Sequence, residues 1–115
     1  MISIGNFNEQ STGAFDCVFT DENGDSVTPD SVKWTITDRS GNVINEREQV
    51  VVASPEATTT ITIYGDDLKI LESEAGNAYV ARFIVVEGTY TSRLGAGLPT
   101  TEEAYFTVKN LRYIS

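Results

Sequence analysis

Two stretches of the sequence alternate between apolar and polar residues: Val32-Lys33-Trp34-Thr35-Ile36-Thr37 and Thr58-Thr59-Thr60-Ile61-Thr62-Ile63-Tyr64. In an extended chain, side chains two positions apart lie on the same face, so each stretch has one apolar face. The opposite faces carry mainly threonine, a residue common in strands. This pattern predicts half-buried antiparallel strands and an all-β protein.

Similar β patterns extend over most of the remaining chain. We expect further strands at residues 2–4, 14–20, 43–48, 78–86 and 104–109, with a short edge strand at 50–52. Turns rich in Gly and Asn separate these segments. The helical candidate, residues 66–72, is long enough for one or two turns. Seven or eight short strands with regular turns predict an antiparallel β-sandwich.

The stretch from residue 78 to 94 is ambiguous, because Glu87-Gly88 interrupts an otherwise continuous β pattern. It is either a hairpin turn or a bulge in one long strand that pairs back with residues 104–109. We favour the bulge, because residues 94–99 are a better place for the chain to reverse. Residues 94–103 are then expected to form a long loop at one end of the sandwich.

A chain of 115 residues is enough for one ordinary domain and too short for two, so we expect residues 1–115 to fold as one unit. Cys17 is the single cysteine, which excludes an intramolecular disulfide. It alternates with Phe15 and Phe19, a pattern that favours a buried apolar residue over a reactive thiol.

The charge balance is strongly acidic, with 17 acids, 8 bases and a formal net charge of −9. Nucleic acids and anionic membrane surfaces would repel such a chain, so we expect neither as a partner. Acidic pairs occur at Asp21-Glu22, Asp66-Asp67 and Glu102-Glu103, and we interpret them as solvated surface. The bases are scattered singly, which indicates surface salt links. The N-terminal residues lack the features of a signal peptide, and no apolar run is long enough for a membrane helix.

No constellation of residues indicates catalysis. The chain has no histidine to act as a base, no Gly-x-Ser-x-Gly motif and no set of zinc ligands. Gly95-Ala96-Gly97 lacks the Gly-Lys-Ser/Thr ending of a phosphate loop. We therefore expect a protein without enzymatic activity, catalytic residues or a cofactor.

A weak calcium candidate lies in the first predicted turn. Asp21, Asn23 and Asp25 alternate as oxygen ligands do in a calcium loop. The glycine and glutamate that an EF-hand needs next are replaced by Ser26 and Val32. The Asn23-Gly24 turn itself is the simpler interpretation.

Two segments are suited to contact with a partner. The C-terminal tail keeps Leu111, Tyr113 and Ile114, which either its own sandwich or a neighbouring subunit must cover. The predicted loop at 94–103 carries Leu98 and Pro99, and loops at the ends of sandwiches commonly make contacts.

Three landmarks resemble those of immunoglobulin-like (Ig-like) domains. Cys17 stands where such a domain has a small inward residue on its second strand, and Trp34, 17 residues later, resembles the inward tryptophan of its third. Glu74-Ala75-Gly76-Asn77-Ala78-Tyr79-Val80-Ala81 resembles a tyrosine corner, with Tyr79 as the ring and Ala81 at the second cysteine position. The resemblance implies a disulfide-free Ig-like sandwich with these four residues as core landmarks.

A second resemblance covers roughly residues 34–111. The segment from Trp34 to Ile44, Ile63-Tyr64-Gly65-Asp66-Asp67-Leu68, and the segment from Gly88 through Pro99 to Val108 resemble strand–turn–strand segments of small tailed-bacteriophage virion proteins. The resemblance implies a structural subunit of the head surface, neck or tail, with no active site. Its partners would be other virion proteins and copies of itself, and it would be made in the host cytoplasm before it joins the virion.

A sugar- or receptor-binding adhesion module is the alternative. It would use Tyr64, Tyr90 or Tyr105 as stacking platforms and would gather exposed aromatic side chains on one face.

Overall fold

The computed structural model describes residues 2–71 and 74–111. These residues form seven strands: β1 (Ile2–Asn8), β2 (Thr12–Val18), β3 (Ser31–Thr37), β4 (Val50–Val51), β5 (Thr58–Tyr64), β6 (Tyr79–Ser92) and β7 (Gly95–Lys109). One 3-10 turn, η1 (Gly65–Leu68), follows β5. The prediction of a mostly β protein with at most a turn or two of helix is confirmed. No helix among the described residues is long and apolar enough to cross a bilayer.

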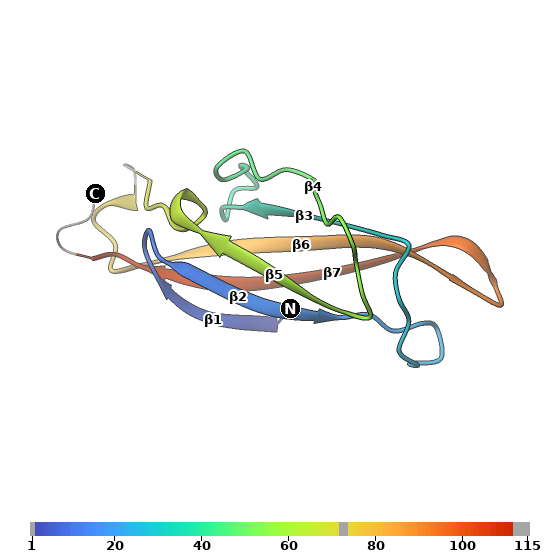
Figure 1. Ribbon diagram of the computed structural model, residues 1–115. Coiled ribbons are helices and arrows are strands. Elements are labelled where there is room, and N and C mark those ends of the chain that lie inside the picture. The colour runs from blue at the N-terminus through green and yellow to red at the C-terminus, as the bar shows by residue number, and fades with distance from the viewer. Residues whose placement is uncertain (1, 72–73, 112–115) are drawn as a thin grey trace.

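The strands are arranged in two sheets of unequal size, which lie one over the other (Figure 1). The larger sheet has the order β1-β7-β6-β3-β4, and the smaller one pairs only β2 with β5. All pairs are antiparallel except β1–β7, which is parallel. The expectation of purely antiparallel pairing is therefore wrong for the first strand.

The core lies between the sheets and follows the period-two pattern of the sequence. β3 buries Val32, Trp34 and Ile36, while β5 buries Ile61 and Ile63. The larger sheet adds further apolar side chains to the same cluster: Val80, Ile84, Val86, Ala104, Phe106 and Val108. Trp34 is 6% exposed, so its prediction as a core residue is confirmed.

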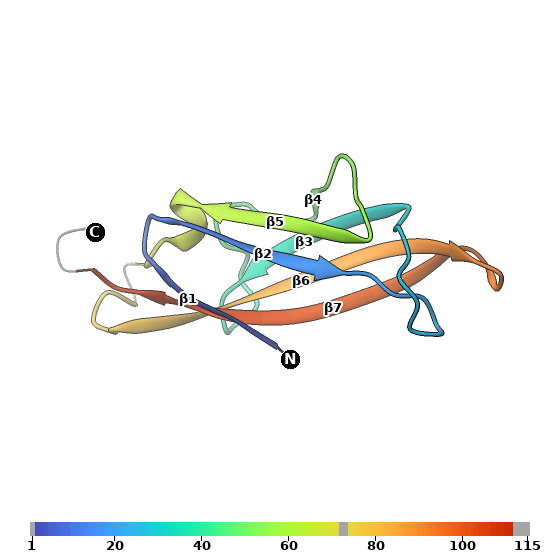
Figure 2. The same cartoon turned by 60° about the horizontal axis from the view of Figure 1, so that its bottom comes forward.

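A long hairpin of β6 and β7 extends beyond the rest of the larger sheet (Figures 1 and 2). β3 pairs with β6 only as far as Thr89, and β1 pairs with β7 only from Ala104 onward. We call residues 89–101 of this hairpin the arm. It gives the molecule an elongated shape, with extents of 53 × 24 × 20 Å.

The interruption at Glu87-Gly88 is neither a hairpin turn nor a bulge. Glu87 pairs with Thr101 and Gly88 with Thr100 in unbroken register, and the irregularity comes later, between Tyr90 and Ser92. A Cβ at Gly88 would meet the Ser31 carbonyl oxygen at 2.9 Å, so glycine is needed there for the close approach of β3. The prediction of one long strand is confirmed, and the predicted bulge at Glu87-Gly88 is wrong.

The long loop expected at residues 94–103 is also wrong. The chain reverses at Arg93-Leu94, and Gly95 already pairs with Ser92. Thr100 and Thr101, expected in the loop, pair with Gly88 and Glu87 of β6. They therefore belong to β7.

Residues 43–48 do not form the predicted strand. Val43 makes an isolated bridge to Thr37 and Ile44 is buried, but the ladder then stops. Asn45 and Glu46 have φ angles of 53° and 56°, a left-handed conformation that cannot continue a strand. The short edge strand expected at 50–52 is confirmed as β4.

The core assignment of Trp34 gives a direct test. We expect Trp34→Ala to lower the free energy of unfolding by about 3–5 kcal/mol, because the indole lies in a packed interior and its loss leaves a cavity. Urea unfolding followed by circular dichroism measures this. Glu102→Gln, at an exposed position, is the control and should change stability by no more than about 0.5 kcal/mol. A Trp34→Ala variant as stable as the control would contradict the assignment.

Candidate functional site

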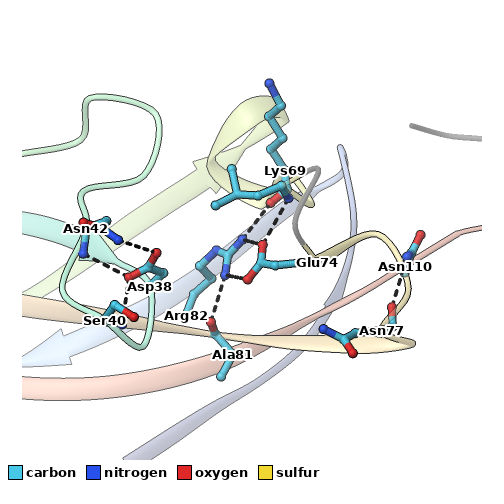
Figure 3. Close-up of polar contacts among 10 residues, drawn as sticks. Asp38, Ser40, Asn42, Lys69, Glu74, Asn77, Ala81, Arg82 and Asn110 are labelled. Atoms are coloured by element: carbon cyan, nitrogen blue, oxygen red, sulfur yellow. Dashed lines mark hydrogen bonds and ion pairs between the residues drawn. The ribbon is translucent and has the colours of Figure 1, made fainter.

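The most elaborate polar cluster of the molecule surrounds Arg82, a fully buried residue of β6 (Figure 3). Its Nη1 donates to Glu74 Oε2 at 2.8 Å, and its Nη2 donates to Glu74 Oε1 at 2.5 Å. The same two nitrogens also donate to the carbonyl oxygens of Ala81 at 3.0 Å and Lys69 at 3.1 Å. This bidentate pair compensates the buried charge.

The alternation of β6 forces Arg82 into the interior, because Val80 and Ile84 on either side of it occupy inward positions. Its Nε atom has no hydrogen-bond partner among the described residues. The interpretation of all the bases as surface salt links is therefore wrong for Arg82. The alternation of β6 is a signal for this inward position, but it does not show the compensating groups, which come from the segment between η1 and β6.

The carboxylates near this cluster are held in their charged form. The hydrogen bonds from Arg82 lower the pKa of Glu74. The backbone N–H of Asn42 is the main cause that lowers the pKa of Asp38 in the neighbouring turn (Figure 3). Two carboxylates that both stay ionised offer no proton donor for general acid catalysis. The Arg82–Glu74 pair holds the segment between η1 and β6 against β6, and the Asp38 contact stabilises the turn after β3.

A second polar cluster forms around Asp67 in η1. Its Oδ1 accepts hydrogen bonds from Asn45 Nδ2 at 2.8 Å and from Arg47 Nε at 2.7 Å, and its Oδ2 accepts the backbone N–H of Tyr64 at 3.0 Å. Asp67 is 0% exposed, so the interpretation of Asp66-Asp67 as solvated surface is wrong for its second member. These contacts hold the segment that fails to form the predicted strand at 43–48.

Arg47 links this cluster to the aromatic residues. Its guanidinium carbon lies 5.8 Å from the centre of the Trp34 ring and 5.6 Å from that of Tyr64. Both distances are within the range of cation–π contacts. The cluster thus closes the sandwich over Trp34.

Cys17 lines a cleft of about 400 Å³ between β2 and β7. The thiol is half-buried, and burial is the main cause that raises its pKa to about 11, with smaller contributions from Glu102 and Asp16. It is protonated at neutral pH and therefore a poor nucleophile. The structure agrees with an apolar role for Cys17, although the side chain is less buried than expected.

The other two landmarks of the Ig-like resemblance are wrong as core residues. Tyr79 is 54% exposed, so its ring does not lie between the sheets. Ala81 is half-buried and alternates with the inward residues Val80 and Arg82, so it faces away from β2. The sequence signal failed because β6 begins with Tyr79 on the outer face.

The calcium candidate residues form a turn. Asp21 Oδ1 accepts the backbone N–H groups of Asn23 at 2.9 Å and Asp25 at 3.0 Å. This contact is typical of an Asx turn, which is the simpler interpretation given above. Among the described residues, no group of three or more acidic, cysteine or histidine side chains could hold a metal ion.

The predicted contact residues are dispersed. Leu98 is half-buried and Pro99 exposed, both in the arm, whereas Leu111 is half-buried at the opposite end of the hairpin. Tyr113 and Ile114 lie outside the described residues. The backbone N–H of Leu111 donates to the buried Glu9 carboxylate at 2.6 Å, which ties the end of the described chain to the turn between β1 and β2.

The three tyrosines of the alternative adhesion site do not share a face. Tyr64 is 54% exposed on the outer face of the smaller sheet, and Tyr105 is 36% exposed on the outer face of the larger one. Tyr90 is 8% exposed. The described residues therefore do not form the aromatic platform that sugar binding requires.

Tyr90 instead anchors the arm. Its hydroxyl donates to Glu22 Oε1 at 3.2 Å, and the Ser92 hydroxyl donates to the same oxygen at 3.0 Å. Burial of the ring, followed by the bond to Glu22, raises the pKa of Tyr90. Glu22, in the turn that follows β2, thus holds the β6 side of the arm as far as Ser92, and the chain reverses directly after it, where Leu94 is 62% exposed.

Comparison with known proteins gives no relative: no family model, curated protein or solved structure matches this chain significantly. Function must be argued from the geometry of the chain itself.

The ion pair of Arg82 predicts an asymmetry between its two partners. Glu74→Met leaves a buried, uncompensated guanidinium and should lower the free energy of unfolding by about 3–5 kcal/mol. Arg82→Met should cost less, because the Glu74 side chain is 21% exposed and can be hydrated. The double variant should be more stable than Glu74→Met alone. Urea unfolding of the three variants tests this, and equal losses for both single variants would contradict it.

The lowered pKa of Glu74 also predicts an acid-dependent loss of stability. A carboxylate whose pKa is lower in the folded than in the unfolded state stabilises the fold above its unfolded pKa, and this contribution disappears as the pH falls through the folded value. Between about pH 5 and pH 3, the parent should lose more stability than Glu74→Gln. Parallel pH profiles from thermal melting would contradict the assignment.

Proposed function

We propose that this chain is a disulfide-free, Ig-like structural subunit of a tailed-bacteriophage particle, at the head surface, neck or tail. It acts without catalysis, by assembly with other virion proteins and with copies of itself. It is made in the host cytoplasm and then becomes part of the virion.

The strand order supports the Ig-like part of this proposal. β3, β6 and β7 are adjacent in one sheet, with the short β4 beside β3, while β2 and β5 pair in the other. In an Ig-like variable-type sandwich strands C, F and G share a sheet that strand C′ extends at its edge, and strands B and E pair in the opposite sheet. The tryptophan lies on β3, where such a domain carries it.

The arm is the observation that carries the assembly role. It projects past the sandwich, is held by the contacts of Glu22 with Tyr90 and Ser92, and presents the exposed Leu94 at its tip. A projecting hairpin does not enclose a small molecule, whereas it can contact a neighbouring subunit. In a symmetric particle, many modest contacts of this kind add up to a stable structure.

The virion role has a direct test. We expect mass spectrometry of purified particles, from the phage that encodes this chain, to detect the protein at a constant ratio to the major capsid protein. A host-expressed, untagged bystander protein of similar abundance serves as the contamination control. Absence of the chain from particle preparations would overturn the proposal.

Shortening the arm separates assembly from folding. Tyr90 pairs directly with Leu98, so an Asn-Gly turn can replace residues 91–97 and still close the hairpin. We expect this variant to remain folded and its incorporation into particles to fall by at least about tenfold, the effect of losing one strong contact. Tyr79→Ser, at an exposed position at the other end of β6, is the control and should be incorporated normally. Normal incorporation of the shortened chain would contradict the role of the arm.

A further inference from the structure

One edge of the smaller sheet carries a row of backbone groups without partners among the described residues. Phe19 N–H donates to Ala57 O, and Gly65 N–H donates to Ser11 O. In an antiparallel pair these bonds alternate, so the odd-numbered residues of β2 face β5. Ala14, Asp16 and Val18 therefore direct their N–H and C=O groups away from β5, and no backbone bond within the described chain uses them.

The cleft described at Cys17 lies along this edge. Its volume is about 400 Å³, and it opens between β2 and the base of the arm. Most of its apolar lining comes from the strands of the two sheets: Ile4, Phe15, Cys17, Val18, Val86 and Ala104. A strand placed beside β2 would direct every second side chain into this space.

The rims of the cleft are acidic. Asp16 lies on the β2 side, where its Oδ1 also accepts a hydrogen bond from the Thr60 hydroxyl at 2.6 Å, and Glu102 lies on the β7 side; both residues are exposed. Both carboxylates contribute to the raised pKa of the Cys17 thiol, which places their negative potential inside the cleft. No basic side chain among residues 2–71 and 74–111 lines it.

We propose that this cleft binds an extended segment of a separate protein, which adds as a strand to the free edge of β2. Apolar side chains of that segment fill the cleft at alternate positions. The lysine or arginine side chains between them lie on the outer face of the smaller sheet beside Asp16, and Glu102 adds negative potential within the cleft. The free backbone groups of β2 supply the hydrogen bonds. The apolar lining favours a segment with apolar side chains at alternate positions, and the carboxylates favour a segment with positive charge. The inference does not depend on the proposed role in the virion.

A second copy of the chain fits this cleft poorly. Each copy carries a net charge of −9, and no two of its eight bases stand two positions apart. Its segments therefore cannot present bases on alternate positions beside apolar residues. The partner must differ in sequence from this chain.

The test uses the intact chain and a seven-residue peptide, with blocked termini, in which lysine and valine alternate. Cys17 reports occupancy, because a bound strand shields its thiol from a disulfide reagent. We expect the rate of thiol modification to fall about tenfold at a peptide concentration about ten times its Kd. Amide exchange should slow at Ala14, Asp16 and Val18 and remain unchanged at Thr60 and Thr62 on the other edge of the sheet.

Two control peptides test separately the contribution of charge and that of the backbone hydrogen bonds. Glutamate in place of lysine should abolish protection, because the rims would repel it. Methylation of every backbone nitrogen should do the same, because the peptide could no longer donate to the edge of β2.

Matched variants test the rims. Asp16→Asn and Glu102→Gln together should weaken binding of the lysine peptide by about threefold to tenfold, in a salt-dependent manner. Glu103→Gln removes the neighbouring charge on the outer face and should leave binding unchanged.

Equal protection by the glutamate peptide or by the methylated peptide would overturn the proposal, and so would a complete lack of protection. Protection of Cys17 without peptide, rising with protein concentration, would also overturn it, in favour of a second copy as occupant. All readings are made on the isolated chain, so absence of the chain from phage particles would leave this result unchanged.

Discussion

The arrangement of the whole molecule depends on the pairing of β6 with a neighbour on each side. β6 pairs with β3 from Thr37 to Ser31 and with β7 along nearly its full length. Its inward positions hold the core residues, the buried Arg82 and Gly88. At Gly88, β3 approaches too closely for any side chain. A slip of one residue would expose the apolar residues and bury the outer ones. This register therefore fixes the core, the ion pair and the arm together.

The sequence predicted what depends on neighbouring residues and missed what depends on distant ones. Alternation located β3 and β5 and buried Trp34, because burial there follows from period two alone. It could not show that Asp67 is buried, since Arg47 and Asn45, 20 and 22 residues away, supply the compensation. The alternation of β6 did place the arginine inward, but only the contact with Glu74 makes that position tolerable.

The edges of the two sheets differ in how they are protected. In β7 the odd-numbered residues face away from β6, because Asn110 N–H donates to Ala78 O. Pro99 occupies such a position and has no N–H, and Glu103 adds a charge, so this edge resists strand addition. β2 has no proline, and its free edge borders an apolar cleft. The arm is thus suited to contacts through side chains, whereas β2 is suited to contacts through its backbone.

The charges of the cleft and of the tip of the arm favour different proposed partners. The acidic rims of the cleft favour a basic segment and disfavour another copy of an acidic chain. The tip of the arm carries Arg93 beside the exposed Leu94, so it combines one base with one apolar group. In the proposed assembly, contact between copies would therefore be most favourable where an arm meets an acidic surface of its neighbour. Such a contact joins two different patches, and heterologous contacts of this kind generate rings or filaments rather than closed dimers.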